Sequence, residues 1–598
     1  MMLWVAVCNT EAKTIYLNTG GTSLWEKDGA NKFAVWHWQG TNAGAWSSWM
    51  THVEGNVWKV DVSDSSDKVI FCRFNNSVSS PGWNSDMWNQ TEDLMPGSNN
   101  LFTITGWGNG KSQGSWSMYD ASGSGGQDGG DNPGGGTPVT PGDYATAVPS
   151  QCEDVMLQAF YWNSDKDNTY GTSKWTALQS QASEISQYFQ MVWLPPSCYS
   201  KSGSMGYLPA KYFQQKNSMG SETELKTLIA AFHNGGVRVL ADVVINHAGN
   251  QSTWTNFFEQ DFGSYGKFSP QSTWITSNDE AQGKGTLGSN ADDGQEANAN
   301  YPSARDWDHK NTQVQAMCRA YLKYLIGEIG YDGFRFDYCG GYHVSHINDY
   351  VSAAKPYFSV MEYWNGNASI LKQRINDAGK NTLTFDFAGF YTCYQQGIAV
   401  NNYGKLVNSG LRGQGYAKYA VNFVDNHDTF NRSDINNSDC GNSKDGSSSL
   451  NNKELIMQCN AYMLSMPGVP CVFWPHWYKY KSEIKAMITA RRRAGIHSES
   501  SVQETSGNGY YEATITGKYG NVIVYLGSSA NKATPQGYTQ AVKGGKYAMY
   551  YIGNGNMQGI ESTPVETSRK SGEKFLKNGQ LYIRLGENVY DVRGNRIN

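Results

Sequence analysis

Long hydrophobic runs are absent from this sequence of 598 residues, in which no 18 consecutive residues are apolar. A membrane-spanning helix needs about 20 such residues, so we expect no transmembrane segment. The first eight residues are apolar, but they are too few for a span and lack a basic flank. We interpret them as the trimmed end of a secretory signal or as a first strand, and we favour a secreted or cell-surface protein.

Charge of either sign is scarce as well. Charged residues make up 17% of the chain, and the net charge at pH 7 is −5. Binding to nucleic acid or to an anionic membrane surface relies on clustered basic residues. The composition therefore argues against both, and we expect no nucleic-acid partner.

Cysteine pairs of the kind that bind zinc or carry out thiol exchange are missing. The ten cysteines are scattered, and no two are separated by only two residues. They do not form the dense framework of a small disulfide-rich domain either. We predict that most are buried free thiols, and the spacing leaves room for one or two disulfide bridges.

Tryptophan, by contrast, is abundant at the start of the chain, since residues 1–120 contain 11 of the 20 tryptophans. Short apolar or alternating segments between Gly, Asn and Ser turns predict a small β-sandwich there. Its core needs only a few of these indoles. The others, above all the cluster within residues 36–49, predict a glycan-binding surface, because indoles stack on the apolar faces of sugars. Any single member is as readily explained as core.

A change in composition divides the chain after this module. Residues 121–145 consist mainly of Gly, Ser, Asp, Asn, Pro and Thr, which predicts a flexible linker. From residue 146 to 494 short apolar strands alternate with helical segments, which predicts a parallel (β/α)8 barrel of the TIM type. The eight predicted strands span residues 155–161, 191–194, 237–245, 333–338, 357–362, 382–387, 420–424 and 469–474.

Two further segments complete the predicted multidomain architecture. Residues 248–305 are far longer than an ordinary βα loop and rich in Gly, Ser, Asn and Asp, so we predict an inserted lobe after the third barrel strand. From residue 495 to 598 the helical pattern stops. Strands such as 510–516 and 521–526 around a Gly-containing turn predict a C-terminal antiparallel β domain, ending in a hairpin.

Acidic residues follow several of the predicted barrel strands, at the end where barrel enzymes carry their functional groups. Asp242, Asp337, Glu362 and Asp428 lie at or just beyond the third, fourth, fifth and seventh strands. One acid of this kind is commonly structural. Several acids crowded at one barrel mouth destabilise a fold, and they therefore indicate function.

Two close carboxyl groups with aromatic neighbours are what glycosidic cleavage requires. Arg335 and Asp337 point to the same face of a strand, and the guanidinium would keep the carboxylate ionised, as a nucleophile needs. A purely structural ion pair is the alternative interpretation. Glu362 lies between Met361 and Tyr363, an apolar setting that raises a carboxyl pKa and suits a general acid.

Four stretches resemble, in order and spacing, the signature regions of the α-amylase family, glycoside hydrolase family 13. They comprise residues 242–247, 335–337, 360–364 and 423–428. Residues 156–162 and 206–209 resemble further stretches of that family. The resemblance extends from residue 155 to the end of the second all-β domain, and it implies a retaining hydrolase of starch and related α-glucans.

The resemblance also implies roles for individual residues. Asp337 would be the nucleophile, Glu362 the general acid/base, and Asp428 a third acid that binds hydroxyls of the distorted sugar. Tyr207 would stack on that sugar, and Asp242 would be a supporting aspartate. The residues implied to hydrogen-bond around the sugar are His247, Arg335 and His427.

Family members bind Ca²⁺ between the inserted lobe and the barrel, so the resemblance implies a calcium site. Ca²⁺ prefers several carboxylate, amide and carbonyl oxygens. The implied ligands are Asn246, Asp306, Asp292 or its neighbour Asp293, and the carbonyl of Gly341. A merely solvated acidic loop is the alternative.

The N-terminal module resembles the family 26 starch-binding modules. This resemblance implies that Trp36 and Trp46 stack on sugar rings and that Gln90 supplies a sugar-binding amide. Two other positions depart from the α-amylase pattern. The stretch 338–341 (Tyr-Cys-Gly-Gly) lacks the usual basic residue after the implied nucleophile, which affects the leaving-group side of the site, and Met361 stands where glycine is usual.

We therefore expect a monomeric endo-acting α-amylase that hydrolyses α-1,4-linked glucan. Within the family, the alternatives are an exo-acting amylase that forms one short maltooligosaccharide and a transglycosylase. The alternative from another class is an inactive starch-binding protein. The presence of all three acids and both histidines argues against it.

Overall fold

The computed structural model describes residues 12–19, 25, 32–54, 56–63, 65–96, 100–108, 110–117, 144–201, 204–249, 253–295, 304–430, 452–555, 573–577, 580–585, 588–591 and 596–597. The chain divides into two compact units, residues 1–132 and 133–598, and each is described by itself. The predicted linker, residues 121–145, lies outside the described residues except for its last two positions.

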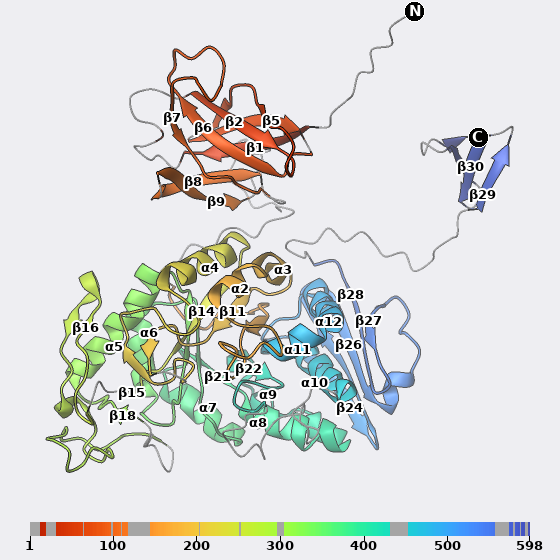
Figure 1. Ribbon diagram of the computed structural model, residues 1–598. Coiled ribbons are helices and arrows are strands. Elements are labelled where there is room, and N and C mark those ends of the chain that lie inside the picture. Colours follow the sequence, from red (N-terminus) through yellow and green to blue (C-terminus); the bar gives the residue numbers. More distant parts are fainter. Residues whose placement is uncertain are drawn as a thin grey trace, which may run out of the picture. The chain divides into compact units, whose positions relative to one another are not determined.

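The N-terminal unit is a β-sandwich (Figure 1). One sheet has the strand order β4-β5-β1-β8-β9 and the other β3-β2-β6-β7. Apolar side chains from both sheets, among them Leu17, Phe33 and Phe71, form a common core. The strands are β1 Ala12–Asn18, β2 Lys32–Trp38, β3 Ala45–Trp46, β4 Thr51–Glu54, β5 Val57–Ser63, β6 Lys68–Phe74, β7 Met87–Gln90, β8 Leu101–Gly108 and β9 Lys111–Ser117.

The second unit contains a closed parallel barrel of eight strands, so the predicted TIM fold is confirmed (Figure 1). All but two residues of these strands, Arg238 and Asn422, are buried. Burial on both faces explains why the strands are continuous apolar runs rather than alternating ones. The barrel strands are β10 Met156–Gln158, β11 Met191–Leu194, β14 Arg238–Val243, β19 Gly333–Phe336, β20 Phe358–Met361, β21 Leu383–Phe385, β22 Ala420–Phe423 and β23 Val469–Phe473.

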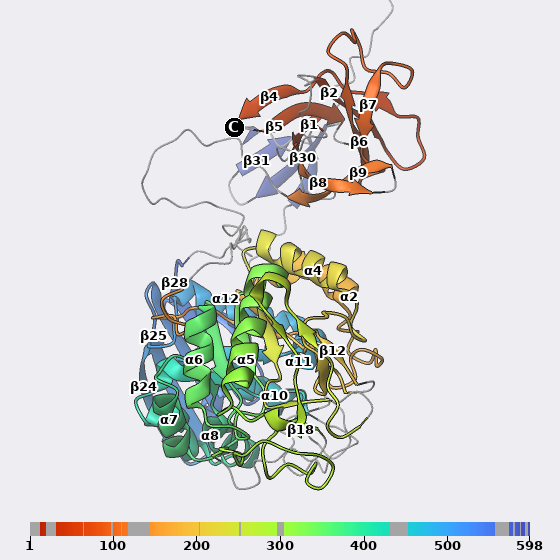
Figure 2. The ribbon, with the colours of Figure 1, turned by 90° about the vertical axis from the view of Figure 1, so that its left-hand side faces the viewer.

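Helices cover the outside of this barrel, and Figure 2 shows α5 and α6 side by side on it. Helix α4 illustrates how the sequence forms them. The Ser221 side chain and Glu224 make a reciprocal capping box, and Leu225, Leu228, Ile229 and Phe232 are buried along one stripe. The helices are α2 Trp175–Gln179, α3 Ala182–Ser186, α4 Glu222–Asn234, α5 Thr312–Tyr324, α6 Ser345–Ala354, α7 Ala368–Asp377, α8 Phe387–Gly389, α9 Gly410–Gly413, α10 Lys453–Ser465, α11 Trp474–Lys479 and α12 Lys481–Ala494.

The predicted inserted lobe follows the third barrel strand. Its two ends are joined by the short antiparallel pair β15 His247–Ala248 and β18 Arg305–Asp306. Between them the described residues form only one further short pair, β16 Gln260–Asp261 with β17 Lys267–Phe268. The lobe therefore begins just beyond the end of β14, where Asn246 and His247 lie.

Beyond the barrel the described residues form antiparallel sheets, as predicted for this domain, and the predicted terminal hairpin is part of a four-stranded sheet. An antiparallel sheet has the order β24-β25-β26-β28-β27, and the terminal strands β29 to β32 form a second antiparallel sheet. These strands are β24 Ser501–Gly507, β25 Tyr510–Thr516, β26 Gly520–Gly527, β27 Thr539–Lys543, β28 Tyr547–Gly553, β29 Glu573–Lys577, β30 Gln580–Leu585, β31 Asn588–Asp591 and β32 Arg596–Ile597.

The structure bears on the predictions of free cysteines and of no transmembrane segment. The eight described cysteines are buried and none forms a disulfide, whereas Cys8 and Cys440 lie outside the described residues. Across the described ranges, every helix is too short or too polar to cross a membrane.

Candidate active site

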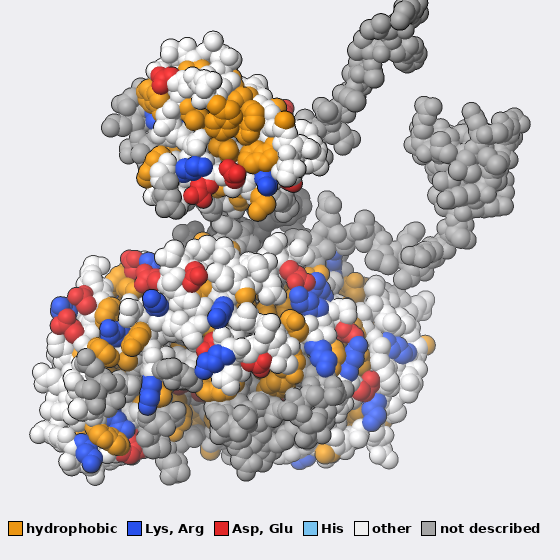
Figure 3. Space-filling view, in the orientation of Figure 1, with side chains coloured by type: hydrophobic (Ala, Val, Ile, Leu, Met, Phe, Trp, Pro, Cys, Tyr) orange, Lys and Arg blue, Asp and Glu red, His pale blue; other side chains and the backbone are white. Residues whose placement is uncertain are grey.

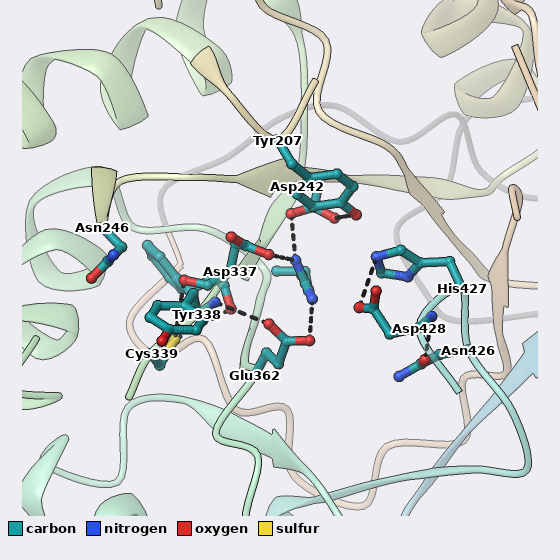
Figure 4. A network of polar contacts seen from close by, with 12 residues as sticks. Tyr207, Asp242, Asn246, Asp337, Tyr338, Cys339, Glu362, Asn426, His427 and Asp428 are labelled. Carbon is teal, nitrogen blue, oxygen red and sulfur yellow. Dashed lines mark hydrogen bonds and ion pairs between the residues drawn. The ribbon is translucent and has the colours of Figure 1, made fainter. Parts of the chain in front are cut away.

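Four charged side chains from three neighbouring barrel strands meet at the carboxyl ends of those strands (Figure 4). The Nη1 atom of Arg335, on β19, lies 2.8 Å from Asp242 and 2.6 Å from Asp337. Its Nη2 atom lies 2.7 Å from Glu362. One guanidinium therefore holds three carboxyl groups, and the predicted Arg335–Asp337 pair is part of a larger cluster.

The chain fixes Asp242 in this cluster from both sides. Trp193 donates its indole Nε1–H to Oδ2 at 3.0 Å, and the Tyr207 hydroxyl donates to the same oxygen at 2.8 Å. Oδ1 is occupied by Arg335. Both oxygens of Asp242 thus accept hydrogen bonds within the protein, which suits Asp242 to orienting Arg335 and Tyr207 rather than to attacking a substrate.

Burial and crowding raise the pKa values of these acids. Burial, together with the charges of Asp242 and Asp428, raises the pKa of Asp337 to about 7, although Arg335 opposes the shift. The same effects of burial and neighbouring carboxylates raise the pKa of Glu362 to about 7. Burial raises the pKa of Asp242 to about 6. The pKa values of Asp337 and Glu362 therefore do not show the expected contrast between an ionised and a protonated acid.

The raised pKa predicts that Asp337→Asn stabilises the fold above neutral pH. A carboxyl with a folded pKa of about 7 and an unfolded pKa of about 3.9 is ionised in both states at pH 8, so its full penalty is present there. As the pH falls through 7 the folded state binds a proton, and the penalty shrinks until it vanishes near pH 4. The melting temperature of Asp337→Asn should thus exceed that of the wild type at pH 8 and approach it at pH 4.5.

The matched control for this prediction is Asp93→Asn, which changes an exposed carboxyl group of the N-terminal unit. It should leave the melting temperature unchanged at both pH values. A lower melting temperature of Asp337→Asn at pH 8 would mean that the ion pair with Arg335 outweighs burial and crowding.

The backbone conformation after β19 directs a hydrogen-bond donor, the N–H of Tyr338, towards Glu362. Tyr338 has φ 48°, in the left-handed region that non-glycine residues rarely occupy. This conformation lets its backbone N–H donate to Oε2 of Glu362 at 3.0 Å. Strain of this kind gathers at functional sites, so the departure from the family pattern at 338–341 coincides with the element that orients the predicted general acid.

Asp428 and His427 form the opposite wall of the site (Figure 4). The side-chain amide of Asn426 accepts from the backbone N–H of Asp428 at 2.8 Å, which fixes the turn after β22. Nε2 of His427 lies 3.2 Å from Asp428. Asp428 is near enough to the other acids for its charge to raise the pKa of both Asp337 and Glu362.

Gln158, at the end of β10, orients the ring of His427. Its side-chain Nε2 lies 3.0 Å from Nδ1 of His427. The other ring nitrogen, Nε2, faces Asp428, so the contact with Gln158 fixes how the imidazole is presented to that acid. Sequence reasoning missed this role, although Gln158 lies in one of the stretches that resemble the family.

Aromatic rings lie beside the same cluster of acids. Tyr207 stacks on His427 with 5.2 Å between centroids and 11° between planes. Trp162 stacks on both, at 5.9 Å from Tyr207 and 6.3 Å from His427. Such a wall presents the flat apolar surface that packs against a pyranose ring.

His247 makes its hydrogen bonds to other residues of the protein. Its Nε2 donates to the Tyr207 carbonyl at 2.9 Å, and its Nδ1 accepts from the Asn246 amide at 3.2 Å. Burial lowers its pKa to about 4, so it is neutral. Both ring nitrogens are used to hold Tyr207 and Asn246 in place.

The residues implied as calcium ligands partly converge beside this site. Asn246 donates to Asp306 at 3.2 Å, and a methyl group on Gly341 would lie 2.0 Å from the Asn246 amide oxygen. Asp292 lies on the segment whose Gln295 N–H donates to the Gly340 carbonyl at 3.1 Å.

Among the described residues, one buried oxygen of Asp292, Oδ2, has no hydrogen-bond partner. Burial raises the pKa of this carboxyl to about 6. Within the described ranges, no three His, Cys, Asp or Glu side chains converge as a metal site. The set of two carboxylates, one amide oxygen and one carbonyl nevertheless has the chemistry that Ca²⁺ prefers, and the unpartnered oxygen fits a cation.

Trp36, Trp46 and Gln90 belong to the other unit of the chain. Trp36 on β2 pairs with Trp46 on β3, and both indoles are half-buried. Gln90 pairs with Cys72 in the register of β7 and β6, so its side chain points to the sheet face that carries the two tryptophans.

The known proteins to which this chain is similar are named as amylases or as related glucan hydrolases. The family profile described as "Alpha amylase, catalytic domain" matches residues 187–476. The chain is 29% identical over 426 residues to alpha-amylase 3, chloroplastic, of Arabidopsis thaliana, covering 66% of this chain and 44% of that protein. It is 28% identical over 479 residues to glucan 1,4-alpha-maltotetraohydrolase of Stutzerimonas stutzeri, covering 74% and 80%.

A shorter match is closer in sequence. Over 136 residues the chain is 35% identical to the alpha-amylase type B isozyme of Hordeum vulgare, covering 22% of this chain and 78% of that protein. The chain thus spans less than half of the plastid relative and most of the other two.

Proposed function

Because the chain belongs to the α-amylase family of glycoside hydrolases, we propose that it hydrolyses α-1,4-glucosidic bonds of starch, glycogen and maltooligosaccharides by endo cleavage with retention of configuration. The observation that carries this proposal is the cluster of Asp337, Glu362 and Asp242 around one guanidinium beside the stacked Tyr207 ring.

In the proposed mechanism Asp337 is the nucleophile. Its Oδ1 is held by Arg335, while its Oδ2 has no hydrogen-bond partner among the described residues and is available to attack the anomeric carbon. Glu362 donates its proton to the glycosidic oxygen as that bond breaks. In the second half Glu362 takes a proton from water, the water attacks the anomeric carbon, and Asp337 is released.

The remaining residues position the sugar. Tyr207 and Trp162 offer ring faces, and Asp428 and His427 present polar groups to hydroxyl groups of the ring. Asp242 keeps Arg335 in place between the two reacting acids. His247 supports the site through its hydrogen bond to the Tyr207 carbonyl.

Product analysis distinguishes the proposed endo action from its alternatives. Chromatography of soluble-starch digests over time should give a ladder of maltooligosaccharides from the earliest samples. One early oligosaccharide would instead support an exo-acting enzyme, as the similarity to a maltotetraohydrolase could suggest. Products longer than an added maltooligosaccharide would support a transglycosylase, and no reducing-sugar release would support an inactive binding protein.

The proposal includes calcium, held by Asn246, Asp292, Asp306 and the carbonyl of Gly341. Bound there, Ca²⁺ would tie the inserted lobe to the third and fourth strand ends and would take no part in bond cleavage. The fit rests on the oxygen donor set and on the unpartnered Asp292 oxygen.

Removing calcium should lower the stability of the protein. A ligand at about 100 times its Kd stabilises the native state by about 2.7 kcal/mol, so a chelator should lower the melting temperature and added Ca²⁺ should restore it. Asp292→Asn is the informative variant. As a ligand change it should lower the melting temperature in Ca²⁺ and reduce the response to chelator.

The opposite change in melting temperature is expected if Asp292 binds no cation. A partly buried carboxylate with one oxygen left without a hydrogen bond destabilises the fold, so Asp292→Asn would then raise the melting temperature equally with and without chelator. Differential scanning calorimetry of the two proteins in Ca²⁺ and in chelator separates these outcomes.

We further propose that the N-terminal unit binds starch through the face that carries Trp36, Trp46 and Gln90, and that the chain acts as a secreted or cell-surface monomer. A binding unit tethered to the barrel would raise the local concentration of the polymer. Deleting residues 1–120 should reduce adsorption to starch granules and leave the hydrolysis of short soluble substrates unchanged.

A further inference from the structure

Three indoles meet on the outer face of the sheet formed by β3, β2, β6 and β7. The ring centroids of Trp36 and Trp46 lie 5.3 Å apart, and Trp83 lies 5.4 Å from the first and 4.9 Å from the second. Figure 3 shows an apolar patch on this unit, over the region where Figure 1 labels β2 and β6. Trp83 comes from the loop between β6 and β7 and was not singled out by the sequence.

Trp36 and Trp46 form the base of this cluster. A methyl group on Gly44 would lie 2.5 Å from the Trp36 indole, so the backbone at Gly44 covers part of that ring. Trp46 packs edge-on against Phe74 at 5.6 Å and also contacts both other indoles. The protein itself therefore covers much of the two rings implied by the family resemblance.

Trp83 is the outermost member of the cluster, with 43% of its surface exposed. Its ring is tilted by 63° to Trp36 and by 54° to Trp46. It packs against both indoles, and its outer side remains exposed to solvent. A ligand that approaches this face meets Trp83 first.

The loop that carries Trp83 is closed by hydrogen bonds. Asn75 donates its backbone N–H to the Asp86 carbonyl at 3.0 Å and its side-chain Nδ2 to the Asp86 carboxylate at 2.9 Å. Trp49 donates its indole N–H to the Ser79 carbonyl at 3.3 Å. A loop fixed in this way loses little conformational entropy when its tip binds a ligand.

We propose that Trp83 is the principal sugar-stacking residue of the N-terminal unit and that its ligand is an α-glucan chain, with the apolar face of one glucose ring lying on the open side of the indole. The exposed residues beside it in the loop, Ser79, Ser80 and Asn84, are uncharged and can hydrogen-bond to hydroxyl groups. The carboxylate in the same loop, Asp86, already accepts from Asn75. A flat indole beside hydroxyl and amide groups suits a neutral sugar. The assignment rests on the proposed starch binding of this unit.

The test compares single tryptophan variants of the full-length chain in adsorption isotherms on starch granules, all in the Asp337→Asn background so that the granules are not digested. Trp83→Ala should weaken adsorption at least about tenfold, as expected for a truncated central aromatic contact, and Trp83→Tyr should recover most of it. Trp107→Ala is the matched control, because Trp107 is similarly exposed, at 47%, on the other sheet, and it should adsorb like the parent.

The outcomes separate this assignment from the function on which it rests. Unchanged adsorption of Trp83→Ala, with adsorption lost on deleting residues 1–120, would overturn the role of Trp83 and keep the starch-binding unit. Tighter adsorption of Trp83→Ala would also overturn it, because Trp83 would then shield Trp36 and Trp46. Adsorption that survives the deletion would refute starch binding by the unit itself.

Discussion

Replacing Asp337 with Asn is expected to abolish hydrolysis of starch and of α-maltosyl fluoride alike, with a loss of about 10⁴-fold or more in kcat. An amide cannot form the covalent glycosyl intermediate, and a better leaving group does not compensate for a missing nucleophile. Adsorption to starch granules should be unchanged. Reducing-sugar release and fluoride-ion release measure the two activities.

Because Asn has the shape of Asp, Asp337→Asn should preserve the other contacts of the site. Asn retains an oxygen that can accept from Arg335, and that guanidinium still binds Asp242 and Glu362. A loss of activity therefore cannot be attributed to collapse of the cluster, provided that the circular dichroism spectrum is unchanged. Hydrolysis of starch at more than a tenth of the wild-type rate would contradict the assignment of the nucleophile.

Glu362→Gln is expected to slow the hydrolysis of starch much more than the first step with α-maltosyl fluoride. Cleavage of a glucosidic bond needs a proton on the leaving oxygen, and general acid catalysis typically contributes 10²–10⁴-fold, so kcat on starch should fall by about 10³-fold. Fluoride leaves without protonation, so the first step with α-maltosyl fluoride should keep most of its rate. A burst of fluoride release in stopped-flow measurements reports that step.

This pair of variants is needed because neither the contacts with Arg335 nor the pKa values distinguish the two acids. Arg335 contacts both carboxyl groups at nearly the same distance, 2.6 Å and 2.7 Å, and burial raises both pKa values to about 7. If Glu362→Gln lost both activities and Asp337→Asn only the hydrolysis of starch, the two roles would have to be exchanged.

The barrel could be predicted because its signal is local. Each strand is a short apolar run buried on both faces, and β11 spans the predicted residues 191–194. The other strands are shorter than predicted by up to several residues, since the apolar pattern continues into the strand ends that carry Asp242 and Glu362. The acids could be predicted as neighbours because parallel strands end at one edge.

The contacts that organise the site could not be predicted in this way. The link from Gln158 to His427 joins residues 269 positions apart, and the link from Trp193 to Asp242 joins residues 49 apart. Nothing in either local stretch specifies its partner. The simultaneous contact of Arg335 with three carboxyl groups likewise depends on strand register, so the expected difference between Asp337 and Glu362 did not appear.

The N-terminal unit shows the same limit. The spacing of Trp36 and Trp46 predicted a cluster, and the structure brings them together. Which indole of the cluster faces outward depends on the backbone at Gly44 and on the path of the loop 75–86, neither of which has a sequence signature.

Trapping the covalent intermediate tests the central claim most directly. A 5-fluoro-α-glycosyl fluoride slows both steps by destabilising the oxocarbenium-like transition state, while its fluoride leaving group still allows the enzyme to be glycosylated. Peptide mapping by mass spectrometry after this treatment should find one added sugar, on Asp337. A label on Glu362 or Asp428, or turnover with no labelled peptide under conditions that trap retaining enzymes, would contradict the account.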